Sequence, residues 1–205
     1  MKKAWFLRSR FVLSVAGILL VSLLVGCSSL SSVISGKPAV LKGVFVDGPV
    51  GGIQYATPTQ KGITKADGVF EYLEGETVTF SLGGLVLGAA AGKAVVSPMD
   101  IVPEAKGVSD QRVVNICVLL QTLDQDGDPA NGILITEKTQ SIVAEHGQSI
   151  VFNKHVRAFS FDSGFRTVMA ELNNIDAFGE TPRAVRPPGV AQKHLEATLA
   201  GLAKK

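Results

Sequence analysis

The stretch VFEYLEGETVTFSLGGLVL, residues 69–87, decides the fold that the sequence predicts. Apolar and polar residues alternate in Val69–Tyr72 and Thr77–Leu82, which is the pattern of half-buried strands. Gly83-Gly84 then separates the second run from Leu85–Leu87, and paired glycines between apolar runs are typical of a tight turn or a bulge. The stretch therefore predicts neighbouring antiparallel strands.

The same signals continue toward the N-terminus of this stretch. Strands are expected at Val44–Val46 and Gly52–Thr57, which Gly and Pro residues separate from their neighbours. Asp67-Gly68 precedes the run that begins at Val69, and this dipeptide tolerates the positive φ of a hairpin turn. Several short strands at this spacing predict a small antiparallel β-sandwich over residues 40–98.

The hydrophobic period changes to helical spacing after Pro98, so residues 99–205 are expected to be mainly α-helical and to pack on or beside the β-rich module. The first helix should be buried, because apolar residues surround its apolar face. A short helix is expected after Thr136, and a last one from about Pro188. The predicted apolar faces consist of Val113, Ile116, Cys117 and Leu120; of Phe165, Val168, Met169 and Leu172; and of Ala191, Leu195, Thr198, Leu199 and Leu202. The fold class is therefore predicted to be α+β.

The first 26 residues have the composition of a secretory signal peptide. They contain Lys2, Lys3, Arg8 and Arg10, no acidic residue, and then the apolar run Phe11–Gly26. A membrane-spanning helix usually needs about 20 apolar residues, so this shorter run favours an export signal over a permanent span.

The tetrapeptide Leu24-Val25-Gly26-Cys27 ends the apolar run and resembles the lipobox of bacterial lipoproteins. This resemblance implies cleavage between Gly26 and Cys27 and acylation of Cys27, which would attach the chain to a membrane through lipid. Ser28 stands where an Asp would signal retention in the inner membrane, so the resemblance implies the outer membrane of a Gram-negative cell. The Ser-rich segment 27–39 is expected to be a tether.

The charge balance argues against nucleic-acid binding. The whole chain has 20 Lys and Arg against 18 Asp and Glu, but four of the basic residues lie in the signal. Their removal leaves 16 basic and 18 acidic residues, a formal charge of about −2. A nearly neutral protein without a basic run lacks the electrostatic footprint that nucleic acid requires.

Two stretches extend the resemblance over most of the chain after the signal. Thr64-Lys65-Ala66-Asp67-Gly68-Val69-Phe70 is similar to the turn and strand of carboxypeptidase-regulatory-like and collagen-adhesin B-type sandwich modules. The segment Leu119–Ile133, LLQTLDQDGDPANGI, resembles a helix and loop of uncharacterised Gram-negative lipoproteins. Such modules are mostly spacers or binding domains, so the resemblance implies an envelope location without supplying a mechanism.

The acidic loop in the second stretch has a spacing suited to calcium. Asp124, Asp126 and Asp128 alternate, with Asn131 nearby, and their oxygens could converge on Ca²⁺. The match to an EF-hand is incomplete, because Pro129 replaces the glycine at position six. Ile135 occupies position twelve, so a bidentate Glu is missing unless Glu137 reaches in. The alternative is that these residues cap a helix and form a solvated turn.

The sequence contains no nucleophile-elbow motif. His155, Ser160, Asp162 and Ser163 lie close together in the chain, but such proximity is no evidence of a catalytic triad. Cys117 lies in an apolar run and is expected to be a buried, inert thiol. The sequence thus favours a non-catalytic envelope protein that binds a protein or polysaccharide; the alternatives are an envelope hydrolase and a calcium-stabilised surface module.

Overall fold

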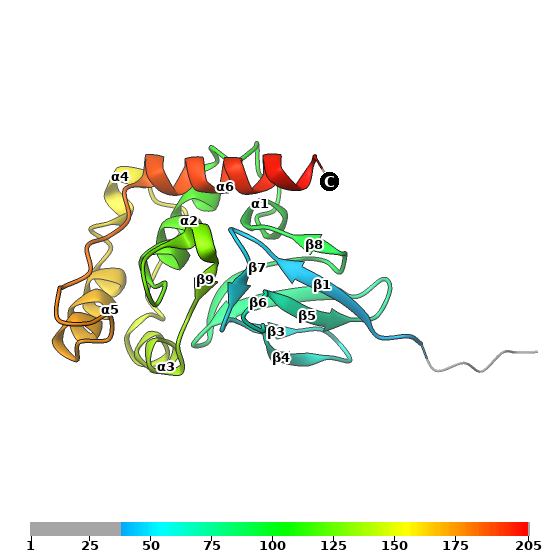
Figure 1. Ribbon diagram of the computed structural model, residues 1–205, viewed down its shortest axis with the longest axis horizontal. Helices are drawn as coiled ribbons and strands as arrows, with labels where there is room; N and C mark the ends of the chain where they lie inside the picture. Colours follow the sequence, from blue (N-terminus) through cyan, green and yellow to red (C-terminus); the bar gives the residue numbers. More distant parts are fainter. Residues whose placement is uncertain (1–37, 205) are drawn as a thin grey trace, which may run out of the picture. The chain divides into compact units, whose positions relative to one another are not determined.

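The computed structural model describes residues 38–204, and this part of the chain contains both sheets and helices, as the predicted α+β class requires (Figure 1). The strands are β1 (Leu41–Phe45), β2 (Val50–Gly51), β3 (Gln54–Ala56), β4 (Lys61–Ile63), β5 (Val69–Tyr72), β6 (Thr77–Leu82), β7 (Leu85–Ala91), β8 (Val95–Val96) and β9 (Ile133–Leu134). The helices are α1 (Pro98–Ile101), α2 (Gln111–Thr122), the 3₁₀ turn η1 (Pro129–Asn131), α3 (Glu137–His146), α4 (Val156–Phe159), α5 (Ser163–Asn174) and α6 (Pro188–Leu202).

The stretch that decides the predicted fold is divided between two sheets. Its strands β6 and β7 pair in a four-stranded antiparallel sheet of order β4-β3-β6-β7, whereas β5 lies at the edge of a three-stranded sheet. Strand β6 alternates exposed or half-buried residues with the buried Val78, Phe80 and Leu82. The Gly83-Gly84 turn joins β6 to β7, and the register shifts between Phe80 and Ser81. The predicted pair of antiparallel strands around Gly83-Gly84 is therefore confirmed, whereas Val69–Tyr72 pairs with β1 and is not a neighbour of β6.

The sequence predicted an all-antiparallel arrangement of the strands, and this is wrong, because two strand pairs are parallel. A three-stranded sheet has the order β5-β1-β8, in which β1 pairs in parallel with β8. Strand β2 pairs in parallel with β9, which lies in the mainly helical half. The two parallel pairs cover only two residues each, too few to leave a period in the sequence.

The two larger sheets contact each other through aromatic side chains. The ring centroid of Phe80 in β6 lies 4.6 Å from that of Phe45 in β1 and 5.1 Å from that of Phe70 in β5. All three side chains are fully buried. Such close, tilted ring pairs add to the free energy of burying the aromatic surface itself.

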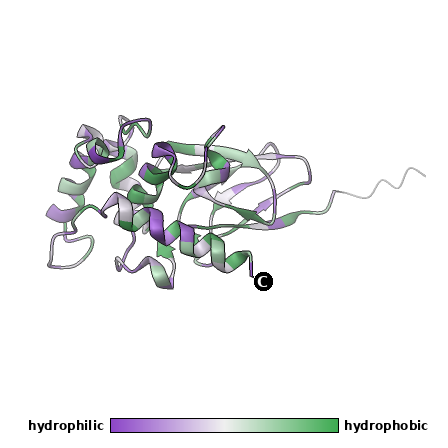
Figure 2. Cartoon of the chain, turned by 90° about the horizontal axis from the view of Figure 1, so that it is seen from above, coloured by the Kyte–Doolittle hydropathy of each residue, from purple (hydrophilic) through white to green (hydrophobic). Residues whose placement is uncertain are grey.

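Helices α2, α3, α5 and α6 lie where helical spacing predicts them, and side chains cap the N-termini of the first three. Asp110 accepts a hydrogen bond from the backbone of α2, Thr136 from α3 and Asp162 from α5. Helix α2 is buried from Val113 to Thr122. In Figure 2 the helices carry both hydrophobic and hydrophilic stretches, as amphipathic helices do.

Both halves of the chain contribute to one hydrophobic core. The buried residues of the sheets and of α2, α5 and α6 form one continuous cluster, and α6 packs along α2 (Figure 1). Residue 98 therefore marks a change of secondary structure inside a shared core. Among residues 38–204, none of the helices has the length and hydropathy of a membrane span.

Candidate functional site

The acidic loop connects the end of α2 to β9 and holds all four residues predicted as calcium ligands. It turns at Gly127, whose φ is +78°. A Cβ there would lie 2.6 Å from Arg183 Nη1, so another residue would strain the turn and displace this guanidinium. Pro129 then begins η1, which leads the chain into β9.

Asp124 and Asp126 form the inner part of the loop. The Asp124 side chain is buried, and its Oδ1 accepts a hydrogen bond of 2.9 Å from the backbone N–H of Leu134. Its Oδ2 is buried without a donor, whereas Asp126 is exposed. Burial, and then the neighbouring Asp126, raise the pKa of Asp124.

Asp128 and Asn131 have other roles in the loop. Asp128 is exposed, and its Oδ1 accepts from the backbone N–H of Ala130 at 3.2 Å, which caps η1. The Asn131 amide donates to Asp126 Oδ2 at 2.9 Å. The structure thus brings Asp124, Asp126 and Asn131 together and turns the Asp128 oxygen to the backbone, as the helix-capping alternative describes.

Two arginines that the sequence did not suggest hold the backbone of the loop. Arg183 donates to the carbonyl oxygens of Asp124 at 2.8 Å and of Gln125 at 3.3 Å, and its guanidinium lies 4.5 Å from the ring centroid of Phe178. Arg186 donates to the carbonyl of Gly127 at 3.4 Å. Both arginines lie about 60 residues beyond the loop in the chain, so no local motif could have revealed them.

A half-open pocket of about 580 Å³ lies beside this loop, and we call it the loop pocket. Its polar lining comes from Asp124, Gln125, Asp126 and Asn131. Its apolar lining comes from β9 and from the segment before Arg183, namely Ile133, Leu134, Ala177 and Phe178, with Ala66 and the glycines 132 and 179 between them. The pocket therefore offers hydrogen-bond acceptors on one side and apolar surface on the other.

The described residues, 38–204, contain no group of three or more His, Cys, Asp or Glu side chains placed to hold a metal ion. Glu137 is exposed in the first turn of α3 and does not line the loop pocket. An EF-hand-like set with Asp128 and Glu137 is thus not assembled, and two carboxyl groups and one amide remain.

A second polar cluster lies inside the core, around Asp47 in the turn between β1 and β2. The Asp47 carboxylate is fully buried and accepts from Gln121 Nε2 at 2.9 and 3.1 Å. The Gln121 amide also donates to the carbonyl of Ala191 in α6 at 3.1 Å. Burial is the largest influence on Asp47 and raises its pKa to about 7.

We expect Cys117 to be unreactive in the folded protein. Its thiol is fully buried, and burial and the Asp47 carboxylate raise its pKa well above the usual value, so little thiolate forms. Maleimide labelling followed by peptide mapping should find Cys117 unmodified under native conditions and modified in denaturant. Rapid labelling of Cys117 in the native protein would contradict this prediction.

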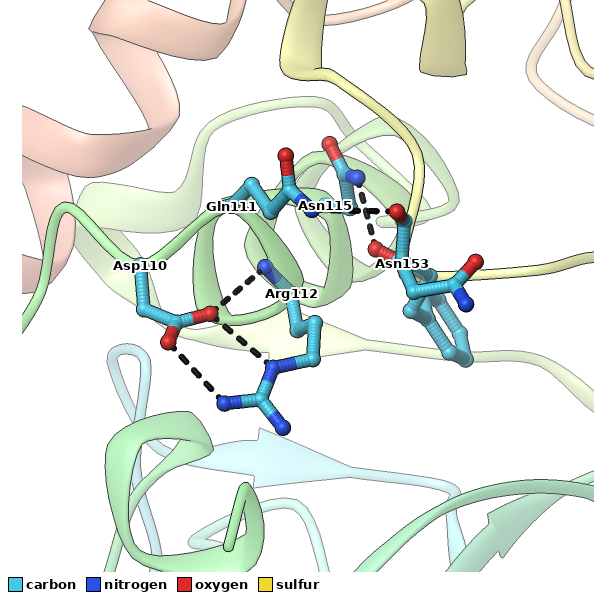
Figure 3. A network of polar contacts seen from close by, with 6 residues as sticks. Asp110, Gln111, Arg112, Asn115 and Asn153 are labelled. Carbon is cyan, nitrogen blue, oxygen red and sulfur yellow. Dashed lines mark hydrogen bonds and ion pairs between the residues drawn. The ribbon is translucent and has the colours of Figure 1, made fainter. Parts of the chain in front are cut away.

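Figure 3 shows the polar contacts at the start of α2. A second open pocket lies beside them, and its lining includes Lys106, Asp110, Arg112 and His155. Asp110 caps the helix and also pairs with Arg112 at 3.0 Å. The buried Asn115 donates to the carbonyls of Phe152 and Lys154 and so fixes the segment that leads into α4. These contacts join secondary-structure elements to one another.

The residues considered for a hydrolase lie at helix ends. His155 Nδ1 accepts from the backbone N–H of Arg157 at the start of α4, and Ser160 ends the same helix. Asp162 caps α5, which begins at Ser163, and pairs with Lys154. The geometry thus gives His155 a capping role and Asp162 a capping and pairing role.

The predicted cleavage and lipidation residues, Gly26 and Cys27, lie outside the described residues. Comparison of the chain with protein-family models, with curated proteins and with solved structures gave no match.

Proposed function

We propose that this protein is a lipoprotein of the Gram-negative cell envelope, anchored in the outer membrane through Cys27, with a non-catalytic binding or structural role. The observation that carries the proposal is the sequence Leu24-Val25-Gly26-Cys27 at the end of an apolar run with a basic start. Several acyl chains on one residue anchor a protein durably, because each buried methylene contributes about 0.8 kcal/mol.

The short distance along the chain between Cys27 and the folded part supports this proposal. The first strand, β1, begins at Leu41, only 14 residues after Cys27. The Ser-rich segment 27–39 between them has the composition of a flexible tether. We further propose that the two larger sheets form a small β-sandwich, which is supported by the buried contacts between Phe80 of one sheet and Phe45 and Phe70 of the other.

The loop pocket supports a binding role. Acidic and amide side chains accept hydrogen bonds from hydroxyl and amino groups, and apolar lining beside them suits a partner that presents both kinds of surface. Leu134 at its edge is 41% exposed, and Ile175, close to the Ala177–Phe178 lining in the chain, is 38% exposed. These features fit an envelope polysaccharide or the surface of another envelope protein.

The anchor is tested by expressing the full chain in a Gram-negative host, with intact mass and membrane fractionation as the measurements. The wild type is expected to have the mass of the chain from Cys27 onward plus acyl groups, and to fractionate with the outer membrane. Cys27→Ala should lose the acyl groups and the cleavage that depends on them.

Ser28→Asp is the matched variant for sorting. It should keep the acyl groups and move to the inner membrane, since the resemblance gives Asp at this place the role of a retention signal. A wild-type chain that keeps its signal, or that is cleaved without acylation, would remove the basis of the lipoprotein proposal.

A further inference from the structure

The buried oxygen of Asp124 lacks a partner, although the residue lines an open pocket. Asp124 is 1% exposed, and its Oδ1 is satisfied by the backbone N–H of Leu134. Its Oδ2 is buried and receives no hydrogen bond, and Asp126 lines the same pocket. A buried carboxylate oxygen without a donor is costly, and a second carboxylate beside it adds repulsion. A cation bound by both carboxyl groups would supply the missing partner of Asp124 Oδ2 and offset this repulsion.

We infer that the loop pocket binds one calcium ion between the carboxyl groups of Asp124 and Asp126. The inference does not depend on the lipid anchor, because both residues belong to the folded body. Asn131 lines the same pocket and carries a carbonyl oxygen, a further ligand type that Ca²⁺ accepts. Water completes the coordination from the open side.

The loop suits calcium better than magnesium. Its oxygens come from one buried and two exposed side chains of an irregular turn, and Ca²⁺ tolerates such irregular geometry, whereas Mg²⁺ demands a near-ideal octahedron. The backbone is held by Arg183, which donates to the carbonyl oxygens of Asp124 and Gln125. This guanidinium is thereby engaged with the backbone. Asp124 Oδ2 is without a partner, and each Asp126 oxygen accepts one hydrogen bond, from the Asp128 N–H or the Asn131 amide, and keeps a further lone pair for the ion.

The small number of protein ligands sets the expected affinity. Two carboxylates and one amide are fewer than the ligands of a calcium sensor, so we expect a dissociation constant of about 10⁻⁴ to 10⁻³ M, the range of extracellular calcium modules. Binding in this range responds to the calcium concentration outside cells.

The test is equilibrium dialysis of the full chain against radioactive calcium, with and without excess Mg²⁺. The wild type is expected to bind one ion per chain saturably. Asp126→Asn should weaken binding by about tenfold or more, because it removes a charged ligand. The matched control is Asp128→Asn, which removes the same charge from an exposed residue of the same loop whose oxygen faces the backbone. It should change the affinity by no more than about twofold.

Circular dichroism in the absence of calcium tests whether the variants are folded. The Asp126 and Asp128 variants should both retain the wild-type spectrum, since both side chains are exposed. Asp124→Asn is the second variant, with the same expected loss of binding. Absence of saturable binding to the wild type would overturn the inference, as would an equal loss in Asp126→Asn and Asp128→Asn. Equal displacement by Mg²⁺ would overturn the assignment to calcium. None of these results bears on acylation of Cys27.

Discussion

Replacing Gly52 with alanine is expected to destabilise the protein by more than about 4 kcal/mol. Gly52 follows β2, has a φ of +83° and lies against the residue that follows β9: an added Cβ would be 1.9 Å from the carbonyl oxygen of Ile135. Backbone atoms on both sides cannot yield as a flexible side chain can. The substitution should therefore separate β2 from β9, and urea denaturation measures the loss.

Gly75→Ala is the matched control, because Gly75 has nearly the same φ, +81°, and no atom within 4 Å of an added Cβ. It carries only the backbone strain of a left-handed alanine, about 1 to 2 kcal/mol. The difference between the two variants isolates the steric effect. If Gly52→Ala were no less stable than Gly75→Ala, the close contact between Gly52 and the backbone of Ile135 would be wrong.

The stability of the protein is expected to fall as the pH rises from about 4 to about 7, by up to about 4 kcal/mol from Asp47 alone. Burial raises the Asp47 pKa from 3.8 to about 7. Between these values the folded protein holds a proton that the unfolded chain has released. Raising the pH therefore favours unfolding in this window, and the contribution is lost once the pH passes the folded pKa.

Asp47→Asn removes this titration, so its free energy of unfolding should depend less on pH than that of the wild type. Urea denaturation of both proteins across pH 4 to 8 measures the difference, in which the contributions of the other groups cancel. The neutral amide also avoids the burial of a charge at high pH. Parallel pH profiles for the two proteins would show that Asp47 does not titrate in this range.

The sequence predicted the elements that carry a strong local period. Strand β6 alternates buried and exposed residues, and α5 repeats Phe165, Val168, Met169 and Leu172 on one buried face. Strand β9 was not foreseen, because two residues have no period and their partner β2 lies about 80 residues earlier in the chain.

Prediction of the candidate site was limited in a similar way. The loop itself was visible because Asp124, Asp126 and Asp128 alternate, but only the structure separates the inward Asp124 from the capping Asp128. Arg183 reaches the loop from a distant segment. Asp47 stands in an Asp-Gly-Pro sequence that is typical of an exposed turn, whereas its side chain is buried beneath α6 by tertiary packing.

The contacts of α6 with the first turn of the fold have a consequence for synthesis of the chain. Gly48 donates its N–H to Thr198 Oγ1, and His194 Nε2 lies 3.0 Å from the carbonyl oxygen of Asp47. These partners are separated by 150 and 147 residues, so the turn cannot reach its final environment until the last helix has been translated. Chains that end prematurely, before α6, would leave Asp47 and the core side of α2 open to water. We expect proteases to remove such fragments and spare the finished protein.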